Sequence, residues 1–229
     1  MSTKGTVVGL DDRCCLNYAK QLKLVVISVD YRLAPAHPFP CALDDCFDAW
    51  QWLLNNADDM GIDPARIAIA GQSAGGGLAA SLAQRIFDQG GSQPAAQALF
   101  CPMLDDRTAE RRDRDLIKHR MWNNTNNRAA WSWYLGSSQS ETALRPYAVP
   151  AKREVLSGLP ATWFGVGGID LFYEEDAHYA TRLREAGVSC QLDTVPMAPH
   201  GFESLVPDAP IVRKFWANNY DFLRQTLNL

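Results

Sequence analysis

The most specific chemical setting in this sequence surrounds a serine. Ser73 lies in the run Gly-Gln-Ser-Ala-Gly at residues 71–75. A G-x-S-x-G pattern between a strand and a helix puts the serine on a sharp turn, with its hydroxyl above the edge of the sheet. The pattern is short and also arises by chance, so its surroundings matter. The apolar residues 67–70 predict a buried strand and residues 78–87 a helix, which makes Ser73 a candidate nucleophile.

A serine hydroxyl needs a base, and an imidazole base needs a carboxylate that fixes its tautomer. Among the four histidines, His200 is the one that follows a predicted strand in a loop. The others lie in a proline-rich turn, in a charged stretch and within a predicted helix: His37, His119 and His178. Asp170 is the favoured acid because it follows an apolar strand and precedes a helix. The order Ser73, Asp170, His200 is the order of the α/β-hydrolase arrangement.

Other carboxylates compete with Asp170 for the role of the acid. Asp105 and Asp106 follow the preceding predicted strand, and Glu174 lies just beyond Asp170. For Glu174, Glu175 and the neighbouring aspartate a simpler interpretation exists, because acidic residues in the first turn of a helix complement its dipole. We therefore keep Asp170 as the prediction and these residues as its alternatives.

Strands and helices alternate along the chain. Strands are predicted at residues 22–29, 65–70, 97–103, 162–167 and 188–194, and helices at 41–56, 78–88, 174–186 and 210–227. Such alternation predicts an α/β fold with a mostly parallel sheet and flanking helices. Ligand sites of these sheets lie outside the carboxyl ends of the strands, where all three candidates fall. Residues 104–150 interrupt the alternation and form a cap-like insertion in one domain spanning residues 1–229.

Composition excludes several classes of function. The 229 residues carry a net charge of −4 without a basic stripe, which argues against nucleic acid and anionic lipid as partners. The longest apolar run near the N-terminus, residues 24–29, is too short to span a membrane, and residues 1–10 lack a signal-peptide core, so we expect a soluble, cytoplasmic protein. The six cysteines have neither disulfide-scaffold nor metal-knuckle spacing, so free thiols, and no metal, are expected.

Four blocks of this sequence resemble the hormone-sensitive lipase family of α/β hydrolases, also called bacterial family IV esterases. The blocks are residues 29–40, 71–76, 168–176 and 200–202. The resemblance implies a carboxylic ester hydrolase that cleaves short- to medium-chain acyl esters through an acyl-enzyme, without a cofactor. It also implies Ser73 as nucleophile, Asp170 as orienting acid and His200 as base. The family usually has Asp where this chain has Gln72, and Asn where it has Gly77.

The largest departure from the family lies at the oxyanion loop. The family carries a His-Gly-Gly-Gly loop whose backbone N–H groups, together with the N–H after the serine, hold the oxyanion. Here Gly5 and Gly9 fit that pattern, whereas residues 2–4 read Ser-Thr-Lys. The resemblance therefore implies Gly5 and Ala74 as oxyanion donors. Loss of one such donor costs on the order of a hundred- to a thousandfold in rate.

The family also has N-terminal cap helices and three strands ahead of the strand predicted here at residues 22–29. The third of these strands lies between that strand and the one at residues 65–70, so we expect a truncated hydrolase whose sheet lacks a central strand. A catalytically impaired or inert hydrolase and a non-catalytic protein that binds small ligands stay as alternatives, and a homodimer stays open. The insertion resembles the family's second cap segment, and four of its side chains either wall an acyl pocket or pack as ordinary apolar residues: Met121, Trp122, Trp131 and Trp133.

Overall fold

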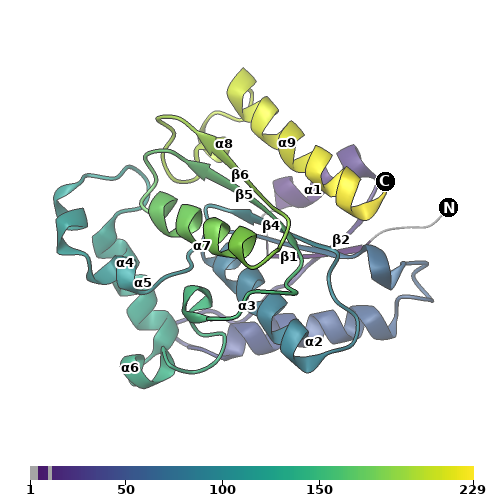
Figure 1. Cartoon of the computed structure of the whole chain (residues 1–229), viewed down its shortest axis with the longest axis horizontal. Helices are drawn as coiled ribbons and strands as arrows, with labels where there is room; N and C mark the ends of the chain where they lie inside the picture. Colours follow the sequence, from purple (N-terminus) through teal and green to yellow (C-terminus); the bar gives the residue numbers. More distant parts are fainter. Residues whose placement is uncertain (1–4, 10–11) are drawn as a thin grey trace.

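The computed structural model describes residues 5–9 and 12–229, with side chains from residue 14 onward. In this part of the chain, six parallel strands form one sheet in the order β2-β1-β3-β4-β5-β6 (Figure 1). The strands are β1 (Gly5–Gly9), β2 (Val25–Ser28), β3 (Ala68–Gln72), β4 (Ala96–Phe100), β5 (Ala161–Gly167) and β6 (Cys190–Val195). The predicted parallel α/β sheet is confirmed, and its five predicted strands correspond to β2 to β6.

Helices cover both faces of the sheet. The long helices are α1 (Asp12–Leu22), α2 (Cys41–Asn55), α3 (Ala74–Gln89), α7 (Tyr173–Glu185) and α9 (Pro210–Leu227). Helices α1 and α9 pack on one face, and α2, α3 and α7 pack on the other (Figure 1). No helix in the described part of the chain is both long and apolar enough to cross a membrane.

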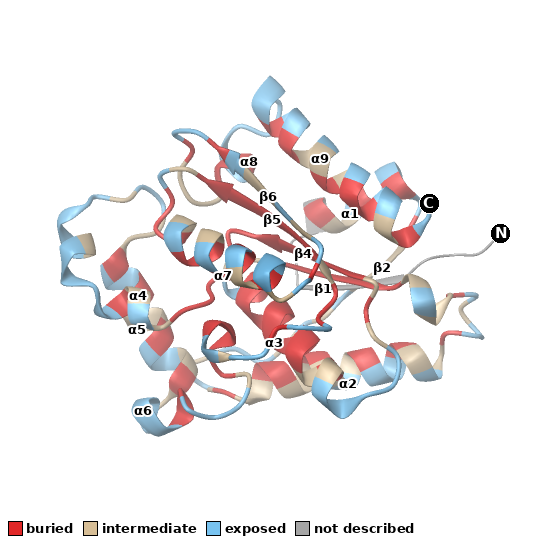
Figure 2. Ribbon diagram, viewed as in Figure 1, coloured by how far each residue is buried: buried red, intermediate tan, exposed pale blue. Residues whose placement is uncertain are grey.

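The core is built by strands whose two faces are both apolar. Along the chain into β3, Ile67 and Ile69 pack against α2 and α3, whereas Ala68 and Ala70 pack toward α1 and α9. Small residues on the second face leave room for a cluster of aromatic rings around Trp163 in β5. Figure 2 shows the result as a buried sheet between helices whose outer faces are exposed. Cys41, Cys46, Cys101 and Cys190 carry free thiols, as predicted.

The expectation that the sheet lacks a strand between β2 and β3 is wrong. Strand β1 occupies this position and pairs with both neighbours, so that Thr6 lies opposite Ala68 and Gly9 lies opposite Gly71. The segment contains Thr-Val-Val at residues 6–8, and β-branched residues favour an extended, pleated backbone. Residues that were expected to form part of an oxyanion loop therefore complete the sheet.

The 104–150 segment joins β4 to β5 and lies to one side of the sheet, at the left of Figure 1. It contains α4 (Arg107–Glu110), the 3₁₀ helix η2 (Arg112–Leu116), α5 (Asn124–Leu135) and α6 (Gln139–Thr142). A second 3₁₀ helix, η3 (Pro150–Lys152), leads back to the sheet. The segment thus adds helices beside the carboxyl ends of the strands, where the candidate site residues lie.

Candidate active site

The chain turns sharply at Ser73, between the end of β3 and the start of α3. Ser73 has φ 54° and ψ −120°, a left-handed backbone that residues with a side chain rarely adopt. The turn closes tightly, because a Cβ on Gly71 would lie 2.1 Å from the carbonyl oxygen of Gly75. The turn therefore requires a glycine at residue 71, and the strain falls on the residue whose hydroxyl has to project from the turn.

The three predicted residues lie in one chain of contacts. The Nε2 atom of His200 lies 3.0 Å from the Oγ atom of Ser73, and its Nδ1 atom lies 2.8 Å from Oδ2 of Asp170. The other carboxylate oxygen of Asp170 accepts the backbone N–H of Phe172 at 3.0 Å, and the Asp170 side chain is fully buried. The ring of Phe172 stands edge-on to the imidazole, with 5.3 Å between the centroids. The carboxylate and the ring together fix the orientation of His200.

The rival acids have partners elsewhere. Asp105 pairs with an arginine of α4, and Asp106 pairs with the lysine of η3. Glu174 pairs with two arginines at and beside η2. Asp170 is the predicted acid that the fold brings to the imidazole.

The two predicted oxyanion donors are separated by the fold. Ala74 is the first residue of α3, and the first N–H groups of a helix have no acceptor within it, so its N–H is available beside Ser73. Gly5 lies at the amino end of β1, opposite Val25, whereas Gly9 ends the strand beside the turn. Four residues of extended chain span about 13 Å. The structure therefore does not bring Gly5 to Ser73, and residues 2–4 of the predicted loop lie outside the described residues.

A cysteine lies beside the Asp170–His200 pair. Ligand atoms of Cys101, Asp170 and His200 all lie within 4.8 Å of one another, the spacing that a shared metal ion requires. Burial raises the pKa of the Cys101 thiol well above its usual value, and the nearby charges of Glu203 and Asp170 raise it further. Because the thiolate is the metal-binding form, a protonated thiol is a poor ligand. The geometry favours use of the Asp170–His200 pair in proton transfer.

An apolar cavity of about 200 Å³ adjoins the turn. Helix α3 contributes four lining residues: Ala74, Gly77, Leu78 and Ser81. The 31–42 stretch and the 104–150 segment supply most of the remaining wall, including Tyr31, Leu33, His37, Trp131, Trp133 and Tyr134. The block at residues 29–40, which carries part of the resemblance to the family, thus also lines the cavity. A pocket wall was predicted for Trp131 and Trp133 but not for this block.

The aromatic residues of the 104–150 segment divide between two places. Trp131 and Trp133 line the cavity, and Trp131 is also almost fully buried. Trp122 lies over the imidazole of His200, with 6.3 Å between ring centroids and 34° between ring planes. Met121 is 60 % exposed. Pocket lining and ordinary packing therefore both occur among the four residues singled out in the sequence.

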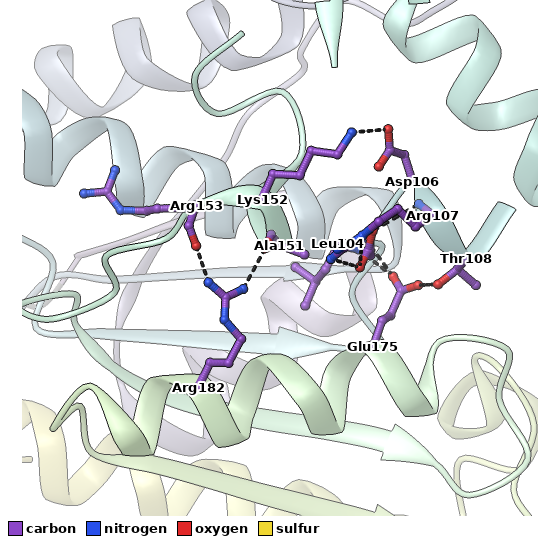
Figure 3. Close-up of polar contacts among 10 residues, drawn as sticks. Leu104, Asp106, Arg107, Thr108, Ala151, Lys152, Arg153, Glu175 and Arg182 are labelled. Atoms are coloured by element: carbon purple, nitrogen blue, oxygen red, sulfur yellow. Dashed lines mark hydrogen bonds and ion pairs between the residues drawn. The ribbon is translucent and has the colours of Figure 1, made fainter. Parts of the chain in front are cut away.

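Helix α7 holds the start of the 104–150 segment and the chain just beyond its end (Figure 3). At the first end, Glu175 accepts the backbone N–H groups of Leu104 at 2.7 Å and Asp105 at 3.1 Å, and also the hydroxyl of Thr108. Burial raises the pKa of Glu175 from 4.5 to about 8. Two turns further along the helix, Arg182 donates to the carbonyl oxygens of two residues in and next to η3.

Two carboxylates near the site are buried, although their residue type predicts exposure. Asp176 is fully buried, neither of its oxygens has a hydrogen-bond partner among the described residues, and burial raises its pKa well above the usual value. Glu203 is 2 % exposed and accepts a hydrogen bond from the side-chain amide of Gln72. Residue type alone places acids on the surface, so the burial of Asp176, which was expected at an exposed helix start, and of Glu203 could not be predicted.

Comparison with known proteins places this geometry in a family. A profile described as the alpha/beta hydrolase fold matches residues 5–204. The carboxylesterase NlhH of Mycobacterium tuberculosis is 33 % identical over 233 residues, which cover 96 % of this chain and 70 % of that protein.

Solved structures agree with the sequence matches. The chain superposes on a bacterial heroin esterase with a TM-score of 0.91 at 33 % identity, covering 99 % of this chain and 75 % of that one. It superposes on an esterase from the bacterial hormone-sensitive lipase family with a TM-score of 0.84 at 28 % identity, covering 99 % and 77 %. The fold and the site define an α/β hydrolase. Within that class, the chain belongs to the hormone-sensitive-lipase-like esterases of bacterial family IV.

Proposed function

We propose that this carboxylic ester hydrolase acts through an acyl-enzyme formed on Ser73. The observation that carries the proposal is the unbroken contact chain from the hydroxyl through His200 to Asp170, at 3.0 and 2.8 Å. His200 takes the proton of Ser73 as the oxygen attacks the ester carbonyl carbon. Asp170 accepts a hydrogen bond from the Nδ1–H of His200 and stabilises the imidazolium that forms.

The rest of the cycle uses the same groups. His200 returns the proton to the departing alkoxide, which leaves as an alcohol and frees the acyl-enzyme. A water molecule then gives a proton to His200 and attacks the acyl carbon. As this second intermediate collapses, His200 returns the proton to Oγ of Ser73 and the carboxylic acid is released. The N–H of Ala74 donates to the oxyanion of both intermediates.

The size of the cavity supports acyl groups of short to medium length. An apolar cavity of about 150 Å³ is known to hold a benzene ring of six carbons. The cavity beside Ala74, at about 200 Å³, is therefore suited to a chain of roughly six to eight carbons. Its lining is mainly aliphatic and aromatic, which favours an acyl chain over a charged group.

The experiment combines turnover with covalent labelling. Hydrolysis of p-nitrophenyl butyrate and labelling by a fluorophosphonate are measured for the wild type, for Ser73→Ala and for Ser140→Ala, an exposed serine in α6. We expect Ser73→Ala to lose labelling and to lose turnover by about 10⁴-fold or more, while Ser140→Ala keeps both. Turnover that survives in Ser73→Ala would refute the mechanism. Labelling of the wild type without turnover would identify the oxyanion site as the deficient part.

A further inference from the structure

A partly buried hydrogen bond joins the two turns that carry the nucleophile and the base. The side-chain amide of Gln72 donates from Nε2 to Oε1 of Glu203, across 131 residues of sequence. Gln72 immediately precedes Ser73, and Glu203 follows His200 by three residues in the short helix α8 (Phe202–Leu205). The bond therefore runs beside the contact on which proton transfer depends.

The backbone between His200 and Glu203 brings the carboxylate to this place. Gly201 has φ 64°, a left-handed conformation that starts α8 directly after the histidine. The nearest heavy atom to a Cβ built on Gly201 would be Nε2 of Gln72, at 4.0 Å. The amide of Gln72 thus lies against the turn that connects the base to the carboxylate.

Other contacts hold the His200 loop to the opposite side of the site. The N–H of Ile169, next to Asp170, donates to the carbonyl of Ala198 at 3.2 Å. Phe202 packs edge-on against Phe215 of α9, with 5.0 Å between ring centroids. These contacts set the position of the imidazole relative to Asp170. The Gln72–Glu203 bond sets the loop relative to Ser73.

The chemistry of this pair requires one neutral and one acidic partner. A carboxylate that is 2 % exposed needs donors, because burial removes its hydration. An amide supplies a donor without adding charge, whereas a second carboxylate at hydrogen-bond distance would repel the first or hold a shared proton. Gln72 at this position therefore matches Glu203, and a carboxylate at both positions would not.

We propose that Gln72 and Glu203 form a clamp that sets the distance between Ser73 and His200, with both acting as positioning residues. The clamp rests on the proposed function, because the distance it sets matters through the proton transfer from Ser73 to His200. A displacement of about 1 Å in an active site can cost on the order of 100-fold in rate. The loss is expected in kcat, because neither clamp residue lines the acyl cavity.

A charge exchange tests the clamp. Three variants are compared with the wild type: Gln72→Glu, Glu203→Gln and the double variant that carries both changes. We expect Gln72→Glu to lower kcat by roughly 10- to 100-fold with little change in KM, since two carboxylates then face each other. Glu203→Gln keeps an amide hydrogen bond and loses less. The double variant restores the amide–carboxylate pair with its members exchanged, and we expect its kcat within about threefold of the wild type.

Controls distinguish an effect of the clamp on kcat from a loss of folding and from an absence of ester hydrolysis. Gln51→Glu, an exposed change of the same kind in α2, should leave kcat unaltered, and thermal unfolding shows which variants are folded. The rate of fluorophosphonate labelling of Ser73 reports on the clamp even if turnover is absent. An inactive wild type would count against the proposed function alone. Equal labelling and kcat in all variants, or a folded double variant as slow as Gln72→Glu, would overturn the clamp.

Discussion

The substitution Glu175→Gln is expected to remove a pH-dependent loss of stability. The carboxyl of Glu175 is buried between α7 and the 104–108 stretch, and its pKa is raised to about 8 mainly by desolvation. Near neutral pH the group is therefore largely protonated. One of its oxygens accepts two backbone N–H groups, and the other accepts the hydroxyl of Thr108. In a glutamine the side-chain oxygen keeps the two backbone hydrogen bonds, and the NH₂ group can donate to the hydroxyl oxygen of Thr108, which is both donor and acceptor.

The magnitude follows from proton linkage. An unfolded glutamate titrates near 4.5 and the folded one near 8, so between these values the folded state holds a proton that the unfolded state has lost. Stability from this group is complete below the unfolded pKa and falls by about 1.4 kcal/mol per pH unit as the pH rises toward 8. From pH 5 to pH 8 the loss is about 4 kcal/mol. Glu175→Gln has no carboxyl that titrates at this position, so its free energy of unfolding rises relative to that of the wild type over the same pH range.

Urea unfolding followed by tryptophan fluorescence measures the effect. The free energy of unfolding is determined between about pH 5 and pH 9 for the wild type and for Glu175→Gln. Glu185→Gln serves as the control, because this glutamate is exposed at the end of the same helix. We expect Glu175→Gln to approach the wild type at the acidic end and to exceed it by several kcal/mol at the basic end. A constant difference across the range would refute the raised pKa, and a variant less stable at pH 9 would refute the burial argument.

Three further substitutions have expected outcomes. In Gly77→Ala the new Cβ would lie 2.1 Å from the carbonyl oxygen of Met103, so we expect a loss of about 1–3 kcal/mol in urea unfolding; an unchanged midpoint would contradict this. Trp133 lines the cavity but is 54 % exposed, so Trp133→Ala should raise kcat/KM for octanoyl relative to butyryl esters by roughly tenfold with little change in stability; an unaltered chain-length profile would count against the acyl cavity. Arg182→Met removes two hydrogen bonds to backbone carbonyls beside the 104–150 segment, and we expect a loss of about 2 kcal/mol in unfolding free energy, which equal unfolding curves would exclude.

The arrangement at the ends of the strands was predictable because it follows from local pattern and chain order. Apolar runs bounded by turns identified β3, β5 and β6, and the parallel sheet placed the residues after them at one edge. The loops then bring the imidazole of His200 to 3.0 Å from Ser73 and 2.8 Å from Asp170. Element boundaries moved by a few residues, as the shortening of the 22–29 strand to Val25–Ser28 shows.

Strand β1 was missed because a short apolar segment carries little information about its partners. Thr-Val-Val between Gly5 and Gly9 suits either a loop beside glycines or a five-residue strand. The choice depends on backbone groups of β2 and β3 that need hydrogen-bond partners on their facing edges. Such a demand is a property of the assembled sheet, so the resemblance to a glycine-rich loop led to the wrong structure for these residues.

The acidic run at the start of α7 shows a second limit. The dipole interpretation treated three neighbouring acids alike, but a helix places successive residues 100° apart around its axis. Glu174 is exposed and pairs with arginines, whereas Glu175 and Asp176 point into the protein. Burial of two acids runs against residue type, and it could be recognised only once the 104–150 segment was seen to supply donors to Glu175.

Helix α7 links parts of the site that the sequence separates. Asp170 lies three residues ahead of its first residue, so the position of the helix affects the position of the acid beside His200. Glu175 and Arg182, on the same helix, fix the start of the 104–150 segment and the chain just beyond its end. That segment carries the aromatic wall of the cavity. Because one helix holds both the acid and the cavity wall, it affects the geometry of proton transfer and the space for the acyl chain together. Substitutions that weaken the contacts of Glu175 or Arg182 should therefore change kcat and chain-length preference in parallel.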